Sequence, residues 1–217
     1  MAETPGQIAE LVERFNRNVE AYQNQLYNET QVRREFIDPF FEALGWDVTN
    51  KAGYAEAYKD VIHEDAIKMG GATKAPDYCF RIGGARKFFL EAKKPAVNIK
   101  DDVDPAYQLR RYAWSAKLPL SILTDFAEFA VYDCRLAPKP ADKSSVGRVL
   151  YLTYKEYADR WDEIEQLTEA VSDLCYLLSV ARGTKIQWIY RDEYDEACPC
   201  GKPELGYFFR WATPISL

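Results

Sequence analysis

A pair of strand-like segments in the first half of the chain constrains the fold more than any other feature. Residues 75–82 (APDYCFRI) and 86–93 (RKFFLEAK) are rich in apolar and aromatic side chains, and glycines occupy positions 83 and 84 between them. This combination predicts a β-hairpin. Side chains alternate between the two faces of a strand, so Glu91 and Lys93 share one face. The length of the hairpin loop then decides whether Asp77 joins them.

Two loop lengths are compatible with the glycines. A two-residue loop, Gly83-Gly84, pairs Asp77 with Leu90, whereas a three-residue loop that also includes Ala85 pairs Asp77 with Glu91. Three-residue loops with a left-handed glycine are common. This register also gathers the apolar side chains on one face, namely Tyr78, Phe80, Ile82, Phe88, Leu90 and Ala92. Because burial of one face specifies the register, we expect the three-residue loop.

Helical periodicity precedes the hairpin. Apolar residues recur at three- and four-residue steps over residues 6–24 and again over residues 29–44, which predicts two helices. Asn28 is a candidate N-cap for the second helix, Gly45 a stop signal, and Pro39 a point at which the helix kinks or divides. Residues 46–48 are expected to form a short strand, and a long loop is expected to lead to residue 75. Loops of that length often have a functional role.

After the hairpin, the pattern predicts a helix at 104–117, strands at 118–124 and 128–134, a loop at 135–148 and a helix from 153 to about 181. This order indicates an α/β domain with a mixed central sheet flanked by helices. We place that domain at residues 1–150. Residues 151–217 are expected to form a helical and irregular C-terminal extension whose role the sequence does not reveal.

The polar face of the hairpin carries a set of groups suited to phosphodiester hydrolysis. Carboxylates such as Asp77 and Glu91 are ligands that Mg²⁺ prefers, and Mn²⁺ can substitute for it. A lysine beside them, Lys93, can orient or deprotonate the attacking water and offset developing negative charge. Two carboxylates and a lysine on a rigid scaffold therefore predict a metal-dependent hydrolase centre.

These residues also resemble a known motif. Pro76-Asp77, followed after the hairpin by Glu91-Ala92-Lys93, resembles the PD-(D/E)xK nuclease superfamily. Gln108-Leu109-Arg110-Arg111-Tyr112 resembles the Q-x-x-x-Y motif of its helicase-linked and restriction-type members. Three parts of the segment 29–47 resemble the start of the nuclease domain in type I restriction subunits and in type IIG restriction-modification enzymes: residues 29–33, 36–39 and 44–47. The resemblance covers about residues 22–160, including the segment 118–133.

The resemblance implies a restriction-endonuclease-like fold and a Mg²⁺-dependent endodeoxyribonuclease acting on double-stranded DNA in restriction or host defence. Gln108 and Tyr112 share a helix face, and the family pattern places Gln108 near the lysine or the DNA backbone. It makes Asp77, Glu91, Lys93 and Gln108 the catalytic candidates. The DNA-contact candidates are Lys94, Gln108, Arg111 and Tyr112. The alternative for the helix residues is an ordinary, partly buried helix face. The sequence also has three basic pairs, Arg33-Arg34, Lys93-Lys94 and Arg110-Arg111, and the alternative for each is a solvated surface.

In these restriction nucleases a helix glutamate often approaches the metal, and the helix geometry selects Glu29 for that role. At 100° per residue from Val32, Glu29 lies at about 60° and Glu35 at about 300°, while the apolar arc spans about 0° to 180°. Glu29 therefore points into the domain and is the third candidate metal ligand, whereas Glu35 is expected to be solvated. The alternative for Glu29 is a charge that stabilises the helix dipole.

The composition and the absence of certain motifs restrict the compartment and the partners that we expect for this protein. The net charge of −6 argues against a nucleic-acid partner, although only the approach to a site needs basic residues. The five scattered cysteines, the missing signal sequence and the missing apolar span indicate a reduced, cytoplasmic protein without a membrane partner. Cys198 and Cys200 form an incomplete zinc set. Phosphate-loop and methyltransferase motifs are absent, so methyltransferase, specificity or motor modules would be separate partners or lie outside this sequence.

Two other functions remain open. One is a repair or recombination nuclease that acts on DNA ends or single strands. The other is a catalytically silent domain that keeps the fold and only binds nucleic acid or partner proteins. An intact set of Asp77, Glu91 and Lys93 argues against the silent domain, since a binding module does not need all three.

Overall fold

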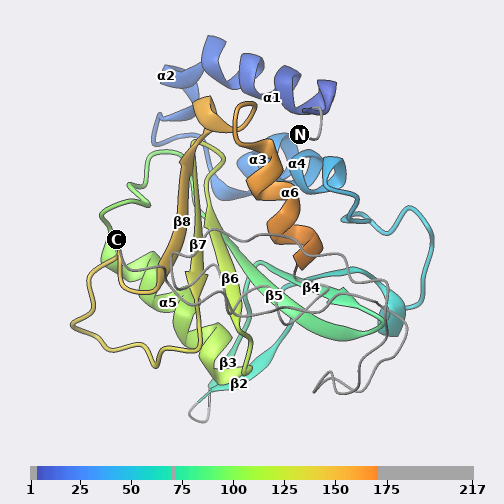
Figure 1. Ribbon diagram of the computed structural model, residues 1–217, viewed down its shortest axis with the longest axis vertical. Helices are drawn as coiled ribbons and strands as arrows, with labels where there is room; N and C mark the ends of the chain where they lie inside the picture. Colours follow the sequence, from blue (N-terminus) through green and yellow to red (C-terminus); the bar gives the residue numbers. More distant parts are fainter. Residues whose placement is uncertain (1–3, 70–71, 171–217) are drawn as a thin grey trace, which may run out of the picture.

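A six-stranded mixed sheet forms the centre of the computed structural model, which describes residues 4–69 and 72–170 (Figure 1). The strand order is β1-β4-β5-β6-β7-β8. β5 and β6 run parallel and are joined through helix α5 (Val103–Ser115), whereas the other neighbouring strands are antiparallel. The strands are β1 (Val61–His63), β4 (Tyr78–Ile82), β5 (Ala85–Ala92), β6 (Leu120–Thr124), β7 (Glu128–Asp133) and β8 (Arg148–Thr153). The mixed sheet expected from the sequence is confirmed.

Helices cover both faces of this sheet. The larger core contains Phe88 and Leu90 from β5 together with aromatic side chains of the N-terminal helices, whereas Phe89 packs in a second core with Leu109 of α5. The alternation along β5 therefore directs Glu91 to the α5 side of the sheet. The other helices are α1 (Gly6–Arg17), α2 (Val19–Tyr22), α3 (Glu29–Val32), α4 (Asp38–Ala43) and α6 (Trp161–Ala170), with 3₁₀ turns at Glu56–Tyr58 and Tyr154–Glu156.

The second N-terminal helix is divided as the sequence suggested. Asn28 caps α3 in a capping box with Gln31, and a π-helical segment, Arg33–Ile37, separates α3 from α4. Pro39 explains the interruption because it has no N–H to donate to the carbonyl of Glu35. Arg14 donates to that carbonyl instead. Proline and a distant arginine together account for the π-helical turn.

The hairpin register differs from the expectation at the loop and agrees with it at the site. Ile82 pairs with Ala85, so the loop is the two-residue Gly83-Gly84 turn and the expected three-residue loop is wrong. Both glycines have positive φ angles, 56° and 78°, as in a type I′ turn. A bulge then shifts the register between Phe80 and Arg81, leaving Lys87 unpaired and matching Tyr78 with Leu90. Continuing this register places Asp77 opposite Glu91, as the longer loop would have done.

Several short strands differ from the sequence analysis. No strand forms at residues 46–48, and the expected long loop contains β1 and a small second sheet of β2 (Ile67–Met69) and β3 (Ala72–Lys74). β8 begins at the end of the predicted 135–148 loop. Ile82, expected in the core, is 40% exposed at the hairpin tip. Three-residue strands are too short for their alternation to identify them.

The segment after residue 150 continues into the same core. The expected boundary at residue 150 falls inside β8, which pairs with β7. Tyr157, Trp161 and Ile164 are buried in the larger core. The described part of this segment therefore packs with the sheet. The rest of the expected C-terminal extension, with the helix beyond residue 170, Cys198 and Cys200, lies outside the described residues.

Candidate active site

Asp77 and Glu91 meet at the point where β4 begins and β5 approaches its end. Asp77 directly precedes β4, and the hairpin register sets it across from Glu91. One oxygen of Asp77, Oδ2, accepts a hydrogen bond of 2.7 Å from the backbone N–H of Ala92. The bulged hairpin thus brings the two predicted carboxylates to neighbouring strands, and a backbone contact fixes the orientation of the first.

Glu91 is the most buried of the catalytic candidates, with 4% of its surface exposed. Its Oε1 atom accepts hydrogen bonds from Lys93 Nζ at 2.8 Å and from Gln108 Nε2 at 2.6 Å. Its Oε2 atom is buried and has no hydrogen-bond partner among the described residues. Burial raises the pKa of Glu91 to about 7, against the opposing effect of the Lys93 ammonium. A buried carboxylate oxygen without a partner is costly unless a ligand satisfies it.

Lys93 stays protonated in this arrangement. Burial alone would lower its pKa, but the negative charges of Glu91, Glu29 and Asp77 outweigh that effect, so the pKa of Lys93 is raised. With 15% of its side chain exposed, the ammonium lies against Glu91. In this state Lys93 is a donor and a positive charge rather than a base.

Glu29 lies near the site, in the direction that its helix angle predicted. Its carboxylate is 3.8 Å from Lys93 Nζ, and 46% of its side chain is exposed. Within the described ranges, no group of three or more His, Cys, Asp and Glu side chains is arranged to hold a metal ion. Glu29 therefore approaches the lysine, and its role as a metal ligand stays a prediction. Glu35, expected to be solvated, is only partly exposed, and its charge adds to the effect of burial in raising the pKa of Tyr27.

The chemistry of the donor set fits a hard divalent cation. Mg²⁺ is commonly held by one or two carboxylates while it keeps several of its waters. Asp77 and Glu91 supply two carboxylates on neighbouring strands, and Glu91 Oε2 is a buried oxygen in need of a partner. Two carboxylates with one unsatisfied oxygen can therefore hold such an ion without a third acidic side chain.

The candidate DNA contacts lie around this centre with different exposures. Gln108 reaches inward to Glu91, and Tyr112 is 9% exposed. Burial and then the charge of Glu91 raise the pKa of Tyr112. Arg111 is exposed, with its guanidinium 5.4 Å from the centre of the Tyr107 ring, and Lys94 Nζ donates to Gln25 at 2.5 Å. Of these four, Lys94 and Arg111 carry the positive charge that a phosphate would meet.

The sequence analysis missed the residue that pairs with Asp77. Arg33 Nη1 lies 3.3 Å from Asp77 Oδ1. The sequence marked Arg33 only as half of a basic pair whose simplest explanation was a solvated surface. A useful signal was available, because Arg33 is four residues from Glu29 and so shares its helix face.

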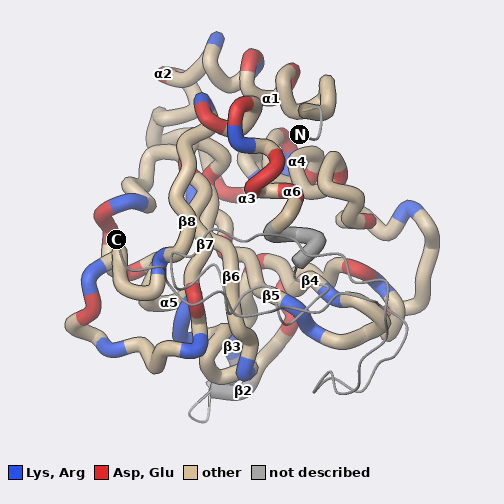
Figure 2. Tube along the Cα trace, in the orientation of Figure 1, with Lys and Arg blue, Asp and Glu red and all other residues tan. Residues whose placement is uncertain are grey.

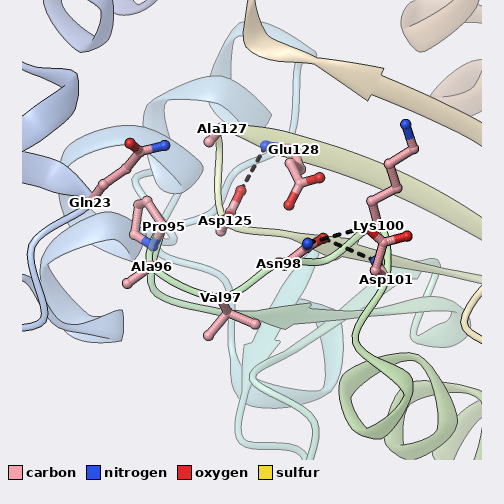
Figure 3. Close-up of a pocket in the computed structure, with 10 residues that line it drawn as sticks. All are labelled: Gln23, Pro95, Ala96, Val97, Asn98, Lys100, Asp101, Asp125, Ala127 and Glu128. Carbon is pink, nitrogen blue, oxygen red and sulfur yellow. Dashed lines mark hydrogen bonds between the residues drawn. The ribbon is translucent and has the colours of Figure 1, made fainter.

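A separate cavity of about 450 Å³ lies beside the loop that follows β5 (Figure 3). Asp125 is fully buried there, accepts a 2.6 Å hydrogen bond from the backbone of Glu128, and has a pKa raised by burial. None of Asp77, Glu91 and Lys93 lines this cavity. Lys93 nevertheless lies near this cavity, because its backbone N–H donates at 3.0 Å to the carbonyl of Thr124, the residue before Asp125. The cavity is therefore a neighbour of the candidate active site and not the site itself.

Most of this chain is similar in sequence to a restriction enzyme. Over 163 residues, or 74% of this chain, the sequence is 42% identical to the type II restriction enzyme and methyltransferase RM.Eco57I of Escherichia coli. This chain is similar to part of a restriction enzyme. It spans 16% of the length of that relative. No protein-family model and no solved structure matches the chain.

The similarity and the fold support each other. A match over 74% of the chain necessarily includes its middle, where Asp77, Glu91, Lys93 and Gln108 lie. The α/β architecture, with a mixed six-stranded sheet between helices, is restriction-endonuclease-like, as the sequence analysis expected. In the described part of the chain, no helix is both long and apolar enough to cross a bilayer.

Proposed function

We propose that this chain is the Mg²⁺-dependent endodeoxyribonuclease region of a restriction system, with a PD-(D/E)xK centre that hydrolyses phosphodiester bonds in double-stranded DNA. The observation that carries this proposal is the cluster of Asp77, Glu91, Lys93 and Gln108, in which one buried oxygen of Glu91 has no partner. The 42% identity to a restriction enzyme supports a role in a restriction system.

Each side chain of the cluster has a distinct role in the proposed reaction. Asp77 and Glu91 would hold the cation, which supplies Lewis-acid activation of the phosphate and of the attacking water. Gln108 fixes Glu91 Oε1 through its 2.6 Å hydrogen bond and leaves Oε2 for the ion. Lys93 presents a protonated ammonium that can donate to a phosphate oxygen and offset the charge that develops in the transition state. Burial of the cluster strengthens each of these electrostatic contacts.

Other modules are part of the proposal. The relative combines a restriction enzyme with a methyltransferase in one protein, and this chain spans 16% of it. We therefore propose that methyltransferase or specificity modules, on this polypeptide or on another, select the cutting site. Along the described trace, Lys and Arg are interspersed with Asp and Glu (Figure 2).

Plasmid cleavage tests the proposed function. The purified protein is incubated with supercoiled plasmid and Mg²⁺, with Mn²⁺, or with chelator, and nicked and linear products are followed by gel electrophoresis. Products that form with either cation and not with chelator support the proposal. Cleavage that persists in chelator contradicts metal dependence, and cleavage of free single strands alone would favour the repair-type nuclease. Duplex binding without cleavage under any condition would favour the silent domain.

The predicted DNA contacts are tested by salt dependence. Lys94→Gln and Arg111→Gln are each expected to weaken binding of a short duplex in chelator and to reduce the salt slope by about 1, because each removes one phosphate contact. Fluorescence anisotropy over a range of salt concentrations measures both quantities. Lys51→Gln is the matched control, since Lys51 is 69% exposed in a surface pair with Glu42. Unchanged slopes in both variants would remove these residues from the interface.

A further inference from the structure

Arg33 sits in a site built around its guanidinium. Nη1 is 3.3 Å from Asp77 Oδ1, and Nη2 is 3.4 Å from the backbone oxygen of Asp77 and 3.3 Å from His63 Nδ1. The guanidinium carbon lies 4.6 Å from the centre of the Tyr78 ring. Only 19% of the Arg33 side chain is exposed. Four contacts of this kind hold the arginine in one orientation.

The groups around Arg33 are themselves held. His63 Nε2 is 3.1 Å from the carbonyl of Val48. Because a carbonyl only accepts, Nε2 must carry the proton, which leaves Nδ1 as an acceptor for Arg33. Tyr78, under the guanidinium, donates from its hydroxyl to Asp38 at 2.6 Å. The guanidinium is therefore placed against Asp77 by a network that does not include the catalytic groups.

The same helix turn supplies charges of both signs to the catalytic strands. Glu29, in the first turn of α3, approaches Lys93 at 3.8 Å, and Arg33, which follows α3, pairs with Asp77 at 3.3 Å. Residues four apart share a helix face, and the π-helical segment that Pro39 imposes begins at Arg33. π-helical turns occur frequently at functional sites. Arg33 is therefore placed to balance Asp77 as Lys93 balances Glu91.

Both oxygens of Asp77 are engaged in the structure. The backbone N–H of Ala92 donates to Oδ2, and Nη1 of Arg33 donates to Oδ1. A cation bound by Asp77 must then share or displace a contact with a permanently positive group, and two positive charges at one carboxylate repel each other. If the guanidinium were absent, the Ala92 N–H would hold only Oδ2, and Oδ1 would lose the contact that fixes it. Arg33 therefore opposes the cation electrostatically while it helps to fix the ligand.

We propose, on the basis of the function proposed above, that Arg33 is a positioning residue acting through Asp77: it lowers the affinity of the site for a divalent cation and fixes the carboxylate in its reactive orientation. The two effects have opposite consequences when Arg33 is removed. The cation binds more tightly, and cleavage becomes slower. If Arg33 only stabilised the fold, its loss would instead reduce both the affinity for the cation and the rate of cleavage.

The test measures cation binding and cleavage separately on the full chain. Mn²⁺ binding without DNA is followed by electron paramagnetic resonance of the free ion, and plasmid nicking is followed at saturating Mn²⁺. Arg33→Gln is expected to bind Mn²⁺ about threefold to tenfold more tightly, from the loss of one nearby positive charge, and to nick about tenfold or more slowly. Arg33→Lys keeps the charge without the planar fork, so its affinity stays near wild type while nicking slows.

Arg34→Gln is the matched control, because Arg34 is the exposed neighbouring arginine and its loss removes the same formal charge. Thermal melts confirm that each variant is folded. Unchanged or weaker Mn²⁺ binding by Arg33→Gln overturns the inference, as does equal tightening by Arg34→Gln. If the wild-type protein binds Mn²⁺ and nicks plasmid while Arg33→Gln does not bind more tightly, only this inference fails. If the wild-type protein binds no Mn²⁺, the proposed function fails with it.

Discussion

Replacing Asp77 or Lys93 by alanine is expected to reduce the rate of Mg²⁺-dependent plasmid cleavage at least about 100- to 1000-fold, the scale seen when one group that stabilises a transition-state charge is removed. The reasons differ between the two variants. Asp77→Ala removes a carboxylate that would hold the cation. Lys93→Ala removes the ammonium that lies 2.8 Å from Glu91 Oε1. Initial rates of nicking at saturating Mg²⁺ measure both effects.

Cation binding separates these two variants. Asp77→Ala is expected to lose Mn²⁺ affinity. Lys93→Ala is expected to bind Mn²⁺ at least as tightly as the wild type, because it leaves both carboxylates in place and removes a positive charge beside Glu91. Lys51→Ala serves as the control, since an exposed lysine in a surface pair contributes little. If both Asp77→Ala and Lys93→Ala cut the plasmid at the rate of the Lys51→Ala control, the reaction takes place elsewhere.

Truncation of the chain after residue 150 is expected to abolish cooperative folding. The cut removes half of β8 and the buried side chains of Tyr157, Trp161 and Ile164. Loss of a buried tryptophan side chain alone typically costs about 3–5 kcal/mol, and domains of this size are stable by only about 5–15 kcal/mol. Trp161 is 2% exposed and packs with Phe40 at a ring distance of 5.7 Å.

Thermal and denaturant unfolding of three chains measures this effect. A chain that ends at residue 170 is expected to unfold cooperatively, the chain that ends at residue 150 is not, and Trp161→Ala in the full chain is expected to lose about 3–5 kcal/mol. Leu26→Ala is the control, because Leu26 is 86% exposed. A stable, cooperative 1–150 fragment would contradict the continuity of the core across residue 150 and favour the domain boundary expected there.

The sequence predicted the register of Asp77 and Glu91 better than the turn that produces it. Because one face of the hairpin was expected to be buried, Asp77 and Glu91 were predicted to lie opposite each other on the second face, and the observed register places them so. It arises from a two-residue turn and a bulge at Lys87 rather than from a three-residue loop. Bulges depend on packing across strands, which a local pattern does not record. A related limit applies to the three-residue strand β1, which becomes visible only once its partner β4 is in place.

The surroundings of the site were harder to predict than its centre. Glu29 follows from helix angles, and Gln108 from a motif. Arg33 requires two elements, the π-helical segment and β4, to be brought together across 44 residues of chain. His63 requires β1, which the sequence did not indicate. Long-range partners of this kind are set by the tertiary fold and not by the spacing of residues within one segment.

The position of a bound cation tests the central claim most directly. Crystals of the protein grown or soaked with Mn²⁺ give an anomalous signal that locates the ion without reference to a model of its ligands. We predict one Mn²⁺ between the carboxylates of Asp77 and Glu91, in direct contact with Glu91 Oε2. A signal at another cluster, or no signal here while DNA is cut in the same buffer, would contradict the proposed centre.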